Sequence, residues 1–188
     1  MARALVVFES MFGNTQKVAE AVAEGLSSRM PTDLLEVGAA SDVLADDVDL
    51  LVVGGPTHAF GMSRPRTRED ATRQAGGHVV SERTGLREWL ASLERRNGNV
   101  AATAFDTRID KPRVPGSTAR GAEKRLRKLG LRIAAPSKSF YVTGVAGPLV
   151  DGETERARRW GRTLAESNAR NRHETRARRP MVPRDPGR

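Results

Sequence analysis

Short apolar runs recur along most of the 188-residue chain and are separated by longer segments of mixed polarity. The runs lie at residues 4–8, 34–37, 50–53, 100–105 and, less compactly, 133–142. Short, mostly apolar runs of this length are typical of strands that are buried on both faces. We therefore predict five strands in one sheet.

The segments between these runs carry apolar residues at helical spacing. Val18, Val22 and Leu26 mark one face of the first such segment, with polar residues opposite. Similar patterns occupy residues 86–93, 119–129 and 157–164, and Gly130 is a natural end for the second of these. Strands that alternate with helices predict an α/β domain with a doubly wound parallel sheet covered on both faces.

Two stretches lack this pattern. Residues 62–84 are polar and almost without apolar periodicity, and we interpret them as a short helix plus a loop over a functional site. Residues 170–188 are rich in arginine and contain three prolines near their end, which favours a disordered basic tail. The predicted organisation is thus one domain at residues 1–169 followed by a tail at 170–188.

The composition excludes several kinds of chemistry. The chain has no cysteine, so disulfides, thiolate metal sites and cysteine nucleophiles are impossible, and redox chemistry requires a bound cofactor. The first apolar run is too short for a signal peptide or a membrane span, so we expect a cytoplasmic protein. The formal charge is +9, of which the tail carries +5, so the domain itself is only moderately basic.

The loop after the first strand has the features of a phosphate site. It reads Ser10-Met11-Phe12-Gly13-Asn14-Thr15 and leads directly into the first helix. Its hydroxyls, its amide and its backbone N–H groups at a helix N-terminus suit a phosphate without any basic side chain. Neither the dinucleotide glycine pattern nor the Lys-Ser/Thr of a P-loop is present. The alternative is an ordinary capped turn without a ligand.

This Ser-x-x-Gly-Asn-Thr sequence resembles the FMN-phosphate loop of the flavodoxin family. The loop after the third strand, Gly54-Gly55-Pro56-Thr57-His58-Ala59-Phe60-Gly61, is similar to the flavin-flanking loop of the same family. The resemblance covers residues 4–165 and implies a three-layer flavodoxin-like fold with strand order 2-1-3-4-5. It also implies FMN at the carboxyl ends of the strands. Residues 144–152 resemble the link between the last strand and the last helix of that family, and we expect them only to turn the chain.

The third flavin loop of the family corresponds to residues 105–108. No tyrosine follows it, and the single Tyr141 falls in the last strand, so Phe60 and His58 are the candidates to stack on the ring. The predicted cofactor-binding residues are Ser10, Met11, Phe12, Gly13, Asn14, Thr15, Pro56, Thr57, His58, Ala59, Phe60, Gly61, Phe105, Asp106, Thr107 and Arg108. No catalytic side chain and no metal ligand is predicted.

Basic residues follow the second and third loops: Arg64, Arg66, Arg68, Arg108, Lys111 and Arg113. Cations within about 10 Å of a flavin would favour its reduced, anionic form, so we expect a reduction potential above that of acidic flavodoxins. The other interpretation is that these side chains are simply solvated. They also suit an acidic partner or the phosphates of NAD(P)H.

The sequence thus predicts an FMN-binding redox protein that exchanges electrons with a partner protein or a small-molecule acceptor. The alternatives are an enzyme similar to NAD(P)H–quinone reductases and a binding protein of the same fold that has lost FMN. A phosphoacceptor receiver domain would need a carboxylate where strand three ends in Gly54, and a low-molecular-weight phosphatase would need a cysteine. We do not expect nucleic acid as a partner, because the tail contains no aromatic residue.

Overall fold

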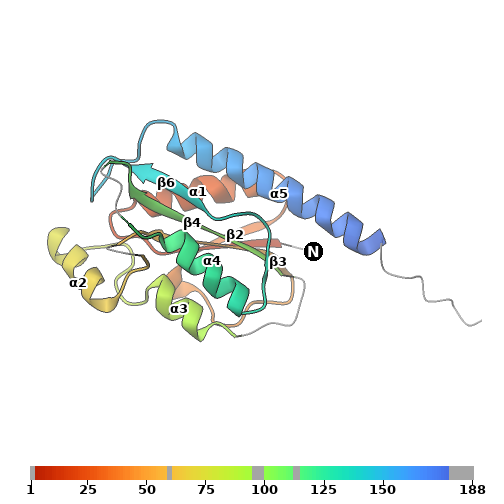
Figure 1. Cartoon of the computed structure of the whole chain (residues 1–188), viewed down its shortest axis with the longest axis horizontal. Helices are drawn as coiled ribbons and strands as arrows, with labels where there is room; N and C mark the ends of the chain where they lie inside the picture. The colour runs from red at the N-terminus through yellow and green to blue at the C-terminus, as the bar shows by residue number, and fades with distance from the viewer. Residues whose placement is uncertain (1–2, 59–60, 95–99, 112–114, 178–188) are drawn as a thin grey trace, which may run out of the picture.

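The fold centres on one parallel sheet (Figure 1). The computed structural model describes residues 3–58, 61–94, 100–111 and 115–177, with side chains up to Asn171. Within these residues the strands are β1 (Arg3–Phe8), β2 (Thr32–Glu36), β3 (Val48–Pro56), β4 (Ala101–Ile109), β5 (Arg132–Ile133) and β6 (Lys138–Val142). Their order is β2-β1-β3-β4-β5, and β6 also pairs with β4. The predicted order 2-1-3-4-5 is confirmed, with the fifth position divided between β5 and β6.

Two helical layers enclose the sheet. Helices α1 (Asn14–Ser27) and α5 (Glu153–Ala177) cover one face, and α3 (Leu86–Ser92) and α4 (Thr118–Lys128) cover the other (Figure 1). Alternate residues of the central strands face the two layers: Val52 packs with α1 and α5, and Val53 packs with α3 and α4. This division follows from the two-residue period of a strand. A short 3-10 helix, η1 (Val37–Ala39), follows β2.

Helices α1 and α5 approach each other unusually closely because two glycines face the contact. A Cβ atom on Gly25 would lie 2.1 Å from the carbonyl oxygen of Arg158, and one on Gly161 would lie 2.3 Å from that of Val22. No larger residue fits at either position without moving a helix. This contact fixes the helical layer that begins at the first loop.

The polar stretch 62–84 contains α2 (Pro65–Gln74), which confirms the predicted short helix. Helix α2 lies at one end of the molecule, beyond the carboxyl ends of the strands and outside the two helical layers (Figure 1). It therefore lies beside the loops that the sequence assigns to the site.

The predicted tail boundary at residue 169 needs correction, because α5 continues to Ala177. Residues 170–177 consist largely of Arg, Ala and Glu, which favour helix, and no glycine or proline occurs before Pro180. The rest of the predicted tail, residues 178–188, lies outside the described residues. In the part of the chain that is described, no helix has both the length and the apolar character that a membrane crossing requires.

Candidate functional site

The loops after β1 and β3 and the carboxyl end of β4 open onto one cavity. Pairing aligns Phe8 with Gly54 and Gly54 with Phe105, so the first loop and the ends of β3 and β4 lie side by side at the carboxyl edge of the sheet. The cavity has a volume of about 340 Å³, within the usual range for small-molecule sites. Its lining residues are Ser10, Met11, Phe12, Asn14, Thr15, Pro56, Thr57, His58, Thr107, Arg108, Ile109, Val142 and Val145.

The first loop presents several hydrogen-bond donors. Gly13 has φ +83°, which turns the chain sharply before α1 begins at Asn14. The Ser10 hydroxyl oxygen accepts from the backbone N–H groups of Gly13 (3.2 Å) and Gln16 (3.3 Å). With both lone pairs engaged, only the hydroxyl proton remains available, and no described residue accepts it. The N-terminal N–H groups of α1 have no intrahelical acceptors, as in any helix.

The side chains of Asn14 and Thr15 join segments around the cavity. Asn14 donates from Nδ2 to the carbonyl of Ala146 (2.9 Å), and the Thr15 and Thr107 hydroxyls lie 2.7 Å apart. These side chains were predicted to face a phosphate, and the structure uses them instead to connect the first loop to its neighbours. The second N–H of Asn14 Nδ2 and one proton of the Thr15–Thr107 hydroxyl pair remain as donors beside the cavity, together with the Ser10 hydroxyl and the backbone of the loop.

Residues 144–152 do more than turn the chain, contrary to the prediction. Val145 lines the cavity, and Ala146 accepts the hydrogen bond from Asn14. Gly147 has φ +97°, and a Cβ there would lie 2.4 Å from Asn14 Nδ2. Only glycine allows this turn to approach the first loop so closely.

The second loop is fixed by backbone and side-chain bonds. Thr57 donates its hydroxyl to Asp106 Oδ2 (2.8 Å) and accepts from the N–H of Thr118 (3.0 Å). His58 and Gly61 exchange a pair of backbone hydrogen bonds, and Gly61 has φ +144°. The predicted ligands Ala59 and Phe60 lie outside the described residues. Gly61 is described but is not among the residues that line the cavity.

His58 carries an unsatisfied polar atom beside the cavity. Its Nε2 is buried and has no partner among the described residues. Burial lowers the pKa of His58, and the positive charge of Arg68 lowers it further, so the imidazole is neutral at neutral pH. A neutral imidazole with a free ring nitrogen can exchange one hydrogen bond with a bound ligand.

Two of the predicted ligands in the third loop are structural. Phe105 is fully buried, with its ring centroid 6.1 Å from that of Phe140 and 6.3 Å from that of Trp160. Its ring fills the space over Gly54, where a Cβ would lie 2.0 Å away. Asp106 is also fully buried and accepts from Thr57 and from the start of α4. Neither residue is among those that line the cavity, and both side chains are buried in the protein.

Three lining residues escaped the sequence analysis: Ile109, Val142 and Val145. Ile109 pairs with Val142 in the β4–β6 ladder, so both follow from the register of the last strand. That register was the missing signal, because a run spread over ten residues does not define which positions face the loops. Together these residues give the cavity an apolar wall on the β6 side.

Charged groups behind the second loop form a buried network. Arg68 is 5% exposed and donates to the Ser63 hydroxyl (3.0 Å) and to Glu88 Oε2 (3.1 Å). Glu9 is 1% exposed and accepts from the N–H of Leu86 (2.7 Å), and burial raises the pKa of its carboxyl group. Arg68 is therefore not a solvated cation facing the cavity, whereas Arg108 lines it. Arg113 lies outside the described residues.

Comparison with known proteins agrees with this architecture. The model of the flavodoxin family matches residues 6–78, which include the first two loops. A flavodoxin from the domain Archaea is 17% identical, with a TM-score of 0.58 over 89% of this chain and 99% of that one. Flavodoxin 2 of Bacillus cereus is 15% identical, with a TM-score of 0.61 over 90% and 99%. Rubredoxin oxygen:oxidoreductase of Desulfovibrio gigas is 19% identical, with a TM-score of 0.60 over 93% of this chain and 37% of that one.

A search of curated proteins found no match to the chain. The sheet order and the cavity at its carboxyl edge define a doubly wound α/β protein with a ligand site at the switch in strand order. The solved structures show that the chain has a flavodoxin-like fold, and its residues 6–78 match the model of the flavodoxin family. FMN is the cofactor of the flavodoxin family, and electron transfer through FMN is the function of that family.

Proposed function

We propose that this chain binds FMN in the cavity between the first, second and third loops and transfers electrons through it. The observation that carries the proposal is the Ser10 hydroxyl, whose proton has no acceptor among the described residues although the residue is fully buried. A buried donor without an acceptor is costly, and a phosphate oxygen would satisfy it.

The residues fit the parts of FMN. The Ser10 hydroxyl and the N-terminal N–H groups of α1 would hold the phosphate, with the positive end of the helix dipole beside it. His58 Nε2 offers a hydrogen bond to a polar edge of the ring system, and the apolar wall of Ile109, Val142 and Val145 suits its flat hydrocarbon part. FMN, when bound, supplies one- and two-electron chemistry, and the protein supplies position and electrostatic field.

The direct test is titration of the purified, flavin-free protein with FMN and, in parallel, with riboflavin, which lacks the phosphate. Ser10→Ala removes the hydroxyl, so the Kd for FMN should rise about tenfold or more, the value of one hydrogen bond to a charged group. Riboflavin affinity should change little. Ser27→Ala, at the far end of α1, is the matched control because Ser27 bonds only within the helix.

A protein that gains no thermal stability from FMN and remains colourless would refute the proposal and favour the binding protein that has lost FMN. The enzyme alternative makes a separate prediction for the loaded protein. Rapid loss of flavin absorbance after NAD(P)H is added under anaerobic conditions would identify an NAD(P)H-dependent oxidoreductase. A carrier would need another reductase.

A further inference from the structure

The segment between β3 and α3 returns to the first loop after α2 and bonds to it directly. The Ser81 N–H donates to the carbonyl of Ser10 (2.8 Å), and the Ser10 N–H donates to the Ser81 hydroxyl oxygen (3.0 Å). The neighbouring Val80 N–H donates to the carbonyl of Met11 (3.1 Å). Three hydrogen bonds thus join the first loop to residues about seventy positions later in the chain.

These bonds lie in the interior. Ser10 is 0% exposed and Ser81 is 1% exposed, so water does not compete for their polar groups. Beside them, Met11 packs with Ala71 of α2 and with Val79 in a small apolar cluster. The inner side of the segment therefore binds the first loop through both polar and apolar contacts.

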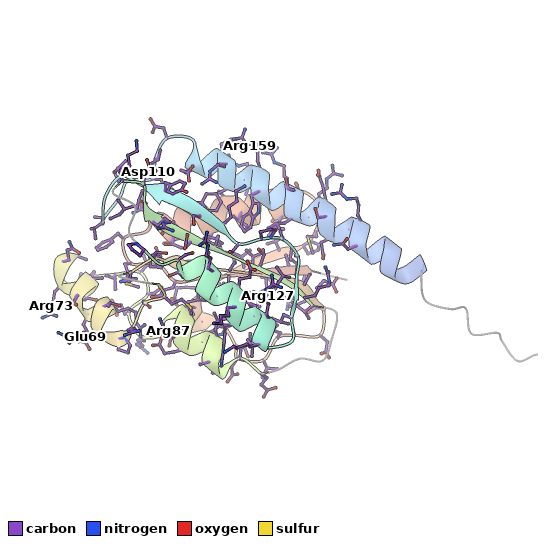
Figure 2. All side chains as sticks on the ribbon, viewed as in Figure 1. Glu69, Arg73, Arg87, Asp110, Arg127 and Arg159 are labelled. Carbon is purple, nitrogen blue, oxygen red and sulfur yellow. The ribbon has the colours of Figure 1, made fainter. Side chains whose placement is uncertain are left out.

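The remainder of the segment is anchored elsewhere. Arg87 of α3 donates to the carbonyls of Met62 and Ser63, where the segment begins. The outer side of α2 carries Glu69 and Arg73, which are exposed and point away from the body in Figure 2. The segment is thus held at its start by α3, while its end is held against the first loop.

All three polar groups of Ser10 are consequently constrained. Ser81 engages its N–H and its carbonyl, and Gly13 and Gln16 donate to its hydroxyl oxygen. The direction of the remaining hydroxyl proton depends on how the Ser10 backbone is held. We propose that Ser81 is a positioning residue that aims the Ser10 hydroxyl and the first turn of α1 at a single monophosphate group.

This inference rests on the proposed binding of FMN. It assigns residues 62–85 the role of holding the first loop, residues 10–15, in position, and we call this segment the brace. It predicts a phosphate-specific effect. Losing the brace should leave contacts to the ring in place, because those come from the second and third loops and from β6. A purely structural serine would instead alter the binding of every ligand to the same extent.

The experiment measures Kd for FMN and for riboflavin with wild type, Ser81→Ala and Ser63→Ala. Ser63 is the matched control, because it is a fully buried serine of the same segment whose hydroxyl bonds to the side chains of Arg68 and Glu9 and not to residues 10–15. For Ser81→Ala, the Kd for FMN should rise about tenfold while that for riboflavin changes by less than about twofold. Ser63→Ala should keep the wild-type preference for FMN over riboflavin.

Ser81→Cys provides a second variant if the alanine protein does not fold. It keeps nearly the same volume but has a weak acceptor in place of the hydroxyl, so it should lose part of the preference for FMN. An unchanged preference in the folded Ser81 variants would overturn the brace while leaving FMN binding intact. A wild-type protein that binds neither flavin would overturn the proposed function and the brace together.

Discussion

Asp106 supports the candidate site from the protein interior, and its replacement should destabilise both the fold and the second loop. Its Oδ2 accepts from the Thr57 hydroxyl (2.8 Å), the Ser117 hydroxyl (2.6 Å) and the Ala119 N–H (3.0 Å). One oxygen therefore connects the second loop to the N-terminal end of α4. The side chain is fully buried, so no solvent replaces it without rearrangement.

Asp106→Ala leaves three donors without their acceptor. A hydrogen bond to a charged group contributes about 1.5–3 kcal/mol, and the sum over three bonds is an upper limit because the donors relax and water enters. Breaking a buried charged network typically costs about 3–5 kcal/mol, and we expect the alanine variant in that range. Asp106→Asn keeps an oxygen acceptor in the same place and should lose about 1–2 kcal/mol.

Urea unfolding of the flavin-free proteins gives these differences as changes in midpoint at constant slope. The alanine variant should also bind FMN more weakly, because Thr57 lines the cavity and loses its anchor. A loss below about 1 kcal/mol in Asp106→Ala would show that the second loop is held by other contacts, and the reasoning would fail.

Three further predictions test other parts of the structure. Gly25→Ala forces a Cβ against the Arg158 carbonyl and should lower the free energy of unfolding by about 3 kcal/mol in a chemical denaturation experiment. Gly121→Ala is the control: its Cβ would make only ordinary contacts, so the free energy of unfolding should stay the same or rise slightly. Burial raises the pKa of Glu9, so the folded state keeps a proton that the unfolded state releases, and wild-type stability should fall as pH rises from 4.5 to the raised value. Glu9→Gln should lack this fall, and stability measured between about pH 4 and pH 8 would reveal it. Arg108→Gln should lower the reduction potential of bound flavin in spectroelectrochemistry, and an unchanged potential would contradict a role for its charge.

The strands and most helices were predictable because their buried positions recur at regular spacing, which appears in the sequence as a regular pattern of apolar residues. The last four residues of β4 were not, since Asp106, Thr107 and Arg108 interrupt the apolar run that ends at Phe105. A polar residue is tolerated in a buried strand when specific partners form hydrogen bonds with it. The partners of Asp106 are Thr57, which is 49 residues away in the sequence, and Ser117, which precedes α4. Sequence periodicity does not contain those partners.

The location of the site was predictable for a different reason. Parallel strands bring their carboxyl ends to one edge, so loops with suitable donors after β1 and β3 had to meet there. Which side chains face the cavity depends on strand register, and this is why Val142 lines the cavity and Phe105 does not, although the sequence alone suggested Phe105 and not Val142. The bonds of Ser81 to the first loop lie beyond any local pattern, because they join two irregular segments.

The proposed phosphate site would hold an anion without a basic side chain on it, although the chain as a whole is basic. Burying a lysine beside Ser10 would require desolvating its charge, whereas backbone N–H groups and a hydroxyl incur a much smaller penalty. The buried guanidinium of Arg68 is directed to Glu88 and Ser63, and so joins α3 to the segment that holds Ser81. In the proposed function, neutral donors would recognise the phosphate, and the buried charge would stabilise the scaffold that positions those donors. Arg108 lines the same cavity, so its charge is the one whose effect on a bound flavin the measurement of reduction potential would test.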